Sequence, residues 1–321
     1  MSSSFKITYS QNWKAYNRAQ TSEIKMFDRL LRGLVEYVEE PIREPTKGRK
    51  PLSRRDALFC AIQKVYSQLS QRRAHTLYRA ARSREHISKP PHFNAIGKIL
   101  NQEEITPPLQ ELLTLSALPL KPMETTFAPD SSGFRTSSFE QYPAYKYGTE
   151  RVHRWLKAHI LVGTKTNVIA SARVTEGEAN DSPFFKPLVM DAYNGGFEIK
   201  EIPADKGYLG RENYNLATEI GATAYIPFKV DSTDKFRGSS TWWKMYHYFQ
   251  LNRDEFMEHY HQRSNVETAF MMIKTKFGDK LKSKNFTAQK NELLCKLIAH
   301  NIVVLIHEME ELGVKADFKP A

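Results

Sequence analysis

The chain has 321 residues, of which 40% are hydrophobic and 26% are charged, a composition typical of globular proteins that excludes disordered and fibrous classes. No apolar run approaches the roughly 20 residues that a membrane-spanning helix requires, and the N-terminus has no signal-peptide pattern, so we expect a cytoplasmic protein without a membrane partner. The net charge of +11 favours a polyanionic partner.

The basic charge is concentrated in one segment. Residues 43–98 contain 14 lysines and arginines against three acidic residues, so this segment alone carries the whole net charge. Such a block is typical of nucleic-acid binding. The alternative interpretation is a solvated basic surface.

Residues 1–120 are predicted to form an all-helical domain that binds DNA ends. Apolar residues recur at helical spacing in four segments: 21–40, 52–69, 70–83 and 92–118. The second and third segments, joined by a short turn, resemble a helix-turn-helix, although many helical bundles share this pattern. The third segment is basic, and we predict DNA contacts from its side chains Arg72, Arg73 and Arg79.

The pattern changes after residue 120. Three predicted strands come first, at 125–130, 154–162 and 167–174, followed by alternating helices and strands and a helical remainder. This order indicates an α/β architecture and is that of a ribonuclease H-like catalytic core. We predict this core over 121–312, preceded by the all-helical N-terminal domain, with a short helical insertion at 228–258 and a tail at 313–321.

A single helix is predicted over residues 260–279, "YHQRSNVETAFMMIKTKFGD". At about 100° per residue, Tyr260, Arg263, Glu267 and Lys274 fall within one arc of roughly 60°. Apolar residues occupy an adjacent arc, which would pack on the core. The simpler interpretation is a salt-bridged solvent face, because Arg263 and Glu267 form an i,i+4 pair.

Two further acidic residues favour a catalytic interpretation. Asp130 and Asp205 are each predicted at the end of a strand, and the first and fourth strands of a ribonuclease H-like core are neighbours. Asp130, Asp205 and Glu267 would then converge, which requires cations to neutralise them. Oxygen ligands select hard cations such as Mg²⁺ or Mn²⁺, and two such ions about 3.5–4 Å apart support phosphoryl transfer.

These motifs resemble those of the DDE transposases encoded by bacterial and archaeal insertion sequences. The spacing of Tyr260, Arg263, Glu267 and Lys274 is similar to the Tyr-Arg-Glu-Lys signature of that family. "FAPDSSGF" around Asp130 resembles its first acidic motif, and "ADKGYLG" around Asp205 resembles its second. The likeness covers about 125–305 and extends loosely into the N-terminal region.

The resemblance implies a metal-dependent enzyme that cuts double-stranded DNA at the inverted repeats of its own element and joins the ends to target DNA. Asp130, Asp205 and Glu267 would hold two Mg²⁺ or Mn²⁺ ions, and Tyr260, Arg263 and Lys274 would contact DNA. A homodimer in the synaptic complex and a nucleoid-associated location are expected by analogy. The alternatives are a related nuclease without joining activity and a domesticated DNA-binding protein.

Four further predictions concern individual residues or segments. Trp242 could stack on an unpaired base, although packing of its ring on the core is the simpler interpretation. The loop 134–151 follows Asp130 and is predicted to contact the DNA backbone. Asp181 is interpreted as a helix-start residue with a possible secondary role in the active site, and His159 as a strand residue rather than a metal ligand.

Overall fold

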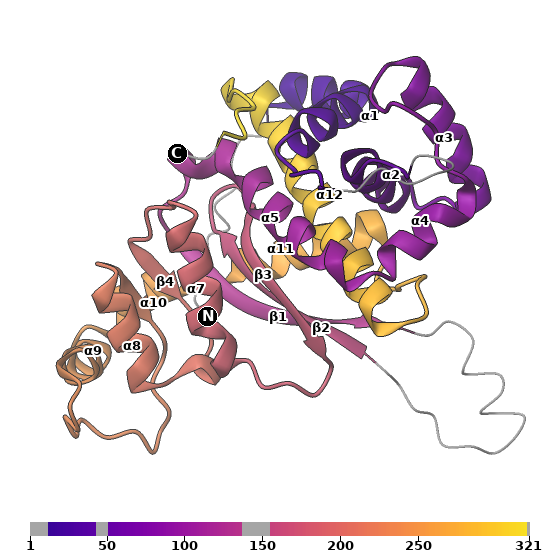
Figure 1. Ribbon diagram of the computed structural model, residues 1–321. Helices are drawn as coiled ribbons and strands as arrows, with labels where there is room; N and C mark the ends of the chain where they lie inside the picture. The colour runs from indigo at the N-terminus through magenta and orange to yellow at the C-terminus, as the bar shows by residue number, and fades with distance from the viewer. Residues whose placement is uncertain (1–11, 43–50, 137–154, 320–321) are drawn as a thin grey trace, which may run out of the picture.

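The computed structural model describes residues 12–42, 51–136 and 155–319. Within these ranges the N-terminal third of the chain is helical, as predicted (Figure 1). Its elements are α1 (Trp13–Val35), α2 (Arg54–Ser67), α3 (Gln71–Ser83), α4 (Phe93–Leu100), the 3₁₀ turn η1 (Glu103–Ile105), α5 (Thr106–Ala117) and the 3₁₀ segment η2 (Leu118–Met123).

Helix α1 begins at Trp13, well before the start at residue 21 that the apolar spacing predicted. The Asn12 side chain accepts a hydrogen bond from the Ala15 backbone N–H at 3.1 Å and thereby caps the helix. The additional turns bury only two small side chains, Ala15 and Ala19, among their apolar residues. Hydrophobic periodicity therefore gave little signal for them.

The long C-terminal helix α12 (Phe286–Leu312) runs through the helical region and packs against α1, α2 and α5 (Figure 1). Polar residues in the buried part of α12 form hydrogen bonds to neighbouring loops. Lys296, for example, donates to the backbone carbonyls of Gly278 and Lys280 at 2.7 and 2.8 Å. No helix in the described ranges combines the length and apolarity needed to cross a membrane. Because α12 shares a core with the N-terminal helices, the domain boundary at residue 120 stays a prediction.

The strands form a mixed β-structure. β1 (Phe127–Arg135), β2 (Trp155–Gly163) and β3 (Ile169–Glu176) pair antiparallel in the order β1-β2-β3, while β4 (Glu201–Pro203) and β5 (Thr223–Tyr225) pair in parallel. A parallel bridge between Thr126 and Glu201 joins the two groups. The predicted neighbourhood of the first and fourth strands is therefore confirmed.

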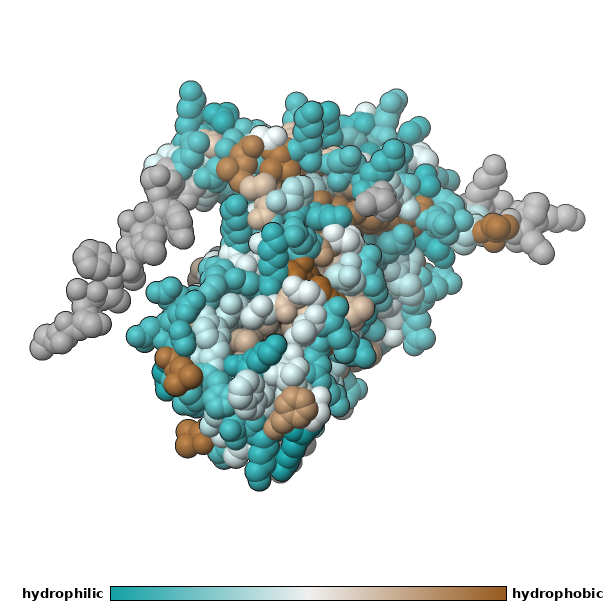
Figure 2. Space-filling view, turned by 90° about the vertical axis from the view of Figure 1, so that its left-hand side faces the viewer, coloured by the Kyte–Doolittle hydropathy of each residue, from teal (hydrophilic) through white to brown (hydrophobic). Residues whose placement is uncertain are grey.

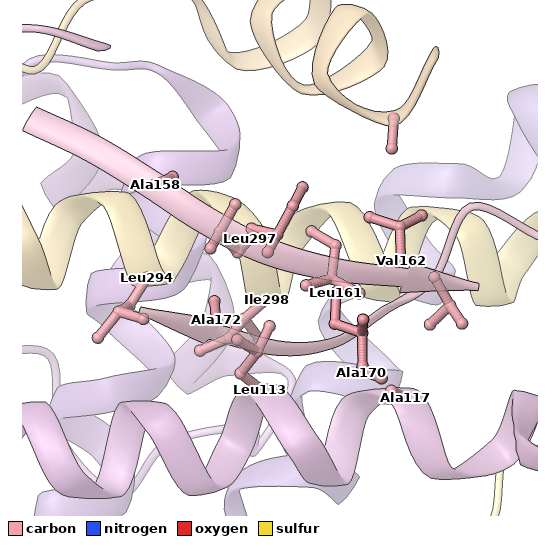
Figure 3. Close-up of a cluster of buried hydrophobic side chains, with 14 of the residues drawn as sticks. Leu113, Ala117, Ala158, Leu161, Val162, Ala170, Ala172, Leu294, Leu297 and Ile298 are labelled. Atoms are coloured by element: carbon pink, nitrogen blue, oxygen red, sulfur yellow. The ribbon is translucent and has the colours of Figure 1, made fainter. Parts of the chain in front are cut away.

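Helices cover both faces of the three-stranded sheet. On one face, Ser171 Oγ donates to the Leu188 carbonyl of α7 (Phe185–Asn194) at 2.7 Å, and Arg173 pairs with Asp191 of the same helix. Helices α5 and α12 pack on the other face. Figure 3 shows the buried contact there among Leu113, Ala158, Ala170, Ala172, Leu294, Leu297 and Ile298.

The remaining elements form the lobe drawn at the lower left of Figure 1 and the helix that returns from it. They are the 3₁₀ turn η4 (Lys206–Tyr208), α8 (Arg211–Glu219), α9 (Ser240–Leu251), α10 (Arg253–His261) and α11 (Ser264–Phe277). The segment predicted as a short insertion, 228–258, contains α9 and most of α10. Aromatic rings pack around Phe228 within this segment. The ring centroids of Trp242 and Tyr246 lie 4.9 and 5.2 Å from the centroid of the Phe228 ring.

Candidate active site

The three predicted acidic residues come from three separate segments. Asp130 lies in the middle of β1, Asp205 caps η4 just after β4, and Glu267 lies in the first turn of α11. The prediction that the first strand ends at Asp130 is wrong, because pairing with β2 continues to Arg135. The strand before Asp205 is also shorter than predicted, since β4 stops at Pro203.

The strand register brings the two aspartates level. Thr126 and Glu201 form a parallel bridge. Asp130 and Asp205 each lie the same number of residues after their member of this bridge. Helix α11 contacts β1 and β2, and its first turn carries Glu267. Asn265 anchors the start of α11 by donating to the Thr164 carbonyl at 2.8 Å.

The guanidinium group of Arg263 lies between these acids. Its Nη2 donates to Glu267 Oε1 at 2.8 Å, and its Nη1 lies 3.7 Å from Asp130 Oδ2. Burial acts to lower the pKa of Arg263, but Tyr260 and the carboxylates of Asp130, Glu267 and Asp205 outweigh it, and the pKa is raised. One cation is therefore within electrostatic reach of all three acids.

The surroundings of Asp130 perturb its carboxyl group. Burial raises the pKa of its carboxyl above the ordinary value, and the nearby Asp181 and Glu267 raise it further. The Ser131 backbone N–H, 2.8 Å from Oδ1, and the Arg263 guanidinium act in the opposite direction. A carboxylate with such neighbours benefits from additional positive charge.

The predicted single helix over 260–279 is wrong, because α10 ends at His261 and α11 begins at Ser264. Four backbone bonds in this region span three residues instead of four: Gln262 to His259, Arg263 to Tyr260, Asn265 to Gln262, and Val266 to Arg263. This tighter winding separates the two helices. Tyr260 nevertheless stays near the site, with its ring centroid 6.0 Å from the Arg263 guanidinium carbon.

Lys274 lies further along α11 and faces β1. Its Nζ donates to Ser132 Oγ at 2.6 Å and lies 5.3 Å from the centroid of the Phe134 ring. Ser132 is two residues beyond Asp130, so both point to the same side of the strand. Burial lowers the pKa of Lys274, against the effect of Asp279. The structure thus brings Lys274 to the same strand face as Asp130.

Sequence reasoning gave Asp181 only a minor role, but in the structure it is close enough to Asp130 to raise the pKa of that carboxyl. Asp181 precedes the 3₁₀ turn η3 (Ser182–Phe184) as its N-cap residue, but its side chain makes no capping hydrogen bond. Its carboxylate lies 2.7 Å from Lys157 Nζ and 3.3 Å from His159 Nδ1. His159 is a buried strand residue, as interpreted, and burial lowers its pKa to about 4.

Tyr208 belongs to the motif around Asp205 but was not among the predicted site residues. Its hydroxyl is buried without a hydrogen-bond partner among the described residues. Burial raises the pKa of Tyr208, and Asp181, Asp130 and Asp205 raise it further. The signal in the sequence was its position three residues after Asp205, within one turn of the same loop.

The alternative of base stacking by Trp242 is wrong for this conformation, because the ring is only 6% exposed. Trp242 Nε1 donates to the Thr233 carbonyl at 2.8 Å, and the Arg211 guanidinium stacks on the ring at 4.2 Å. The simpler interpretation, packing on the core, agrees with these contacts. The neighbouring Trp243 is 46% exposed and is the accessible indole of this pair.

The basic side chains of α3 point outward. Ala74, Tyr78 and Ala81 form the buried side of the helix, and the exposed side carries Arg72, Arg73 and Arg79. Figure 2 shows another face of the molecule that is mostly hydrophilic, with hydrophobic residues in small separate groups. DNA binding by the three arginines stays a prediction, and most of the loop 134–151 lies outside the described residues.

The donor atoms around Arg263 suit a hard divalent cation, since the carboxylates and the Tyr208 hydroxyl all offer oxygen. In the described ranges, however, no three Asp, Glu, His or Cys side chains lie close enough together to hold one metal ion. Arg263 stands between Asp130 and Glu267 and supplies positive charge there. A metal site at these acids therefore stays a prediction.

Acidic side chains from three distant segments thus gather around the Arg263 guanidinium on a helix-covered sheet. Residues 121–302 match the sequence model of the family described as "Transposase DDE domain". The match spans more than half of the chain, so the chain belongs to this transposase family. No solved structure was found that matches the chain.

Proposed function

We propose that this transposase cleaves DNA at the terminal inverted repeats of an insertion sequence of the Tyr-Arg-Glu-Lys group and joins the ends to target DNA. The observation that supports the proposal most strongly is that Asp130, Asp205 and Glu267, from distant segments, all act on the Arg263 guanidinium. The strand order β3-β2-β1-β4-β5 supports a ribonuclease H-like core.

Asp130, Asp205 and Glu267 would hold the divalent cations. Two Mg²⁺ or Mn²⁺ ions would supply activation of the attacking water or 3′-hydroxyl and stabilisation of the leaving oxygen. Burial and the neighbouring acids destabilise the charged form of Asp130 and raise its pKa, so a bound cation would stabilise this carboxylate. Arg263 neutralises these acids in the present conformation, and its side chain has to share them with the cations.

Basic and aromatic residues beside the acids would position the DNA backbone. The Arg263 fork suits the paired oxygens of a phosphate, and Lys274, held by Ser132, would contact a second phosphate along β1. Tyr260 lies on the other side of Arg263 and would bind near the cut end. The exposed arginines of α3 would bind the transposon end, and two protomers would bring two ends together in a cytoplasmic, nucleoid-associated complex.

The test uses the purified chain with a labelled duplex that carries the inverted repeat found beside its coding region. We expect cleavage and joined products in Mg²⁺, and loss of both, by at least 10³-fold, in Asp205→Asn. Asp231→Asn, which changes an exposed acid in the insertion, is the matched control and should keep full activity. Cleavage without joined products would instead support a nuclease, and DNA binding without cleavage would support a domesticated binding protein.

A further inference from the structure

A groove of about 660 Å³ lies where the N-terminal helices meet the start of α12. It is lined by the end of α2, the start of α3, helix α4 and residues 282–288. Four charged side chains line it, and all are lysines: Lys64, Lys98, Lys282 and Lys284. No described acidic residue lines this groove, so its walls carry only positive charge.

Lys64 gives the groove a feature that a solvated basic surface lacks. This residue is only 7% exposed, but its ammonium nitrogen is not buried and makes no hydrogen bond or ion pair within the described ranges, so it is available to an anion in the groove. Lys282 is close enough for Lys64, together with burial, to lower the pKa of Lys282. The acid behind them, Glu292, instead accepts the backbone N–H groups of Lys282 and Ser283 at 2.9 and 2.7 Å.

Two helix N-termini add to the positive field of the groove. Ser70 precedes α3 and Asn285 precedes α12, and neither side chain caps its helix. The first backbone N–H groups of both helices are therefore left to other acceptors. The groove also offers neutral hydrogen-bonding side chains of the kind that contact phosphates and sugars: Gln71, Asn94, Asn101 and Ser283.

Helix α11 connects the acidic site with the neighbourhood of the groove. Phe277, the last residue of that helix, lines the adjoining small cavity, which shares Lys64 and Lys282 with the groove. From Glu267 to Phe277 the helix rises about 15 Å, and Lys274 lies between them. That distance corresponds to roughly four to five base pairs of B-form DNA.

We propose that this lysine groove binds the phosphate backbone of the DNA duplex whose end is cut at the acidic site, four to five base pairs from the scissile bond. The inference rests on the proposed function for the identity of the DNA and names where the flanking duplex is held. Lys98 and Lys284 contact phosphates at its mouth, and Lys64 neutralises one at its base.

The experiment measures binding of the labelled duplex to the full chain by fluorescence anisotropy at several salt concentrations. Each lost phosphate contact lowers the slope of log K against log salt by about 0.9. We therefore expect the double variant Lys98→Ala/Lys284→Ala to lower this slope by roughly two. In a footprint of the bound duplex, this variant should no longer protect the DNA backbone four to five base pairs from the cut. The control, Lys315→Ala/Lys319→Ala, changes two lysines in a second groove that also contains Asp317, and it should leave both readouts unchanged.

Lys64→Met tests the buried lysine separately. If Lys64 is held for a phosphate, this variant weakens DNA binding at least fivefold while the melting temperature stays equal, because the Lys64 ammonium has no partner among the described residues whose loss would destabilise the fold. A lower melting temperature with unchanged DNA affinity would assign Lys64 a structural role and overturn its part in the proposal. A slope and footprint in the Lys98/Lys284 variant equal to the control would overturn the groove itself.

These outcomes separate the groove from the proposed function. If the wild-type chain cleaves in Mg²⁺ while the groove variants bind like the control, the groove inference fails and the function stands. If the groove variants lose slope and footprint but the wild-type chain does not cleave, the function fails and the groove stands as a DNA-binding surface.

Discussion

Replacing Arg263 by glutamine tests the acidic site directly. The substitution removes a guanidinium that donates to Glu267 at 2.8 Å and lies 3.7 Å from Asp130. Glu267 is 62% exposed, so its pair contributes about 0.5 kcal/mol. Asp130 is largely buried, and loss of a charged partner there adds about 1–1.5 kcal/mol. We expect the free energy of unfolding to fall by about 1.5–2 kcal/mol in metal-free buffer.

Magnesium should restore part of this loss. At 10 mM Mg²⁺ and a Kd of about 1 mM, binding to the folded state alone adds about 1.4 kcal/mol. The wild-type chain should gain less, because Arg263 already neutralises the acids. The assay is urea unfolding followed by tryptophan fluorescence, with EDTA and with Mg²⁺, and it needs no DNA and no activity.

Arg32→Gln is the matched control, since Arg32 forms the same type of i,i+4 pair with Glu36 at 3.3 Å on an exposed face. It should cost less than about 0.5 kcal/mol and show no additional response to Mg²⁺. An Arg263→Gln variant as stable as the wild type in EDTA, or equal stabilisation of this variant and the wild type by Mg²⁺, would refute the proposed role of Arg263.

Three further predictions concern stability. Asn301→Leu removes bonds to Ile169 N and O at 2.9 and 2.8 Å and should lower the free energy of unfolding by about 3–5 kcal/mol in urea titrations. Burial lowers the pKa of His300 to about 4 in the folded chain, so as the pH falls the unfolded chain takes up a proton on this histidine before the folded chain does. The free energy of unfolding should therefore fall by up to about 3 kcal/mol as the pH drops from 7 to 4. The His300→Gln variant should lack this pH-dependent component. Trp242→Ala should cost about 3–5 kcal/mol, whereas Trp243→Ala should change thermal stability little and serves as its control.

Two results would contradict these predictions. An Asn301→Leu variant as stable as the wild type would mean that the backbone groups of Ile169 find other partners. Equal slopes of stability against pH for the wild type and His300→Gln would show that His300 does not titrate differently in the two states.

The strands and helices of the central region could be predicted well from local patterns. The hairpin β2-β3, the helix α8 and the short strand β5 follow from hydrophobic spacing and turn residues over a few neighbouring positions. Asp130, Asp205 and Glu267 could be singled out because each belongs to a motif with residues at fixed spacing. The family match over 121–302 agrees with that interpretation.

The predicted element boundaries were wrong where pairing between distant segments or tighter helix winding determined the local structure. The extension of β1 past Asp130 depends on hydrogen bonds to β2, and the break before Ser264 depends on backbone bonds that no residue pattern announced. The burial of Trp242 depends on Arg211, Phe228 and Thr233 from other elements. Local propensity is overridden at such positions by contacts between distant segments.

The sequence by itself determined the composition of each element, the basic character of the N-terminal region and the identity of the acidic residues, because these are properties of neighbouring positions. Only the tertiary structure decided that Arg263 stands between the acids, that Asp181 and Tyr208 lie within electrostatic reach of Asp130, and that four lysines share one groove. Those arrangements depend on strand register and helix packing, which place side chains from distant parts of the chain within a few ångströms of one another.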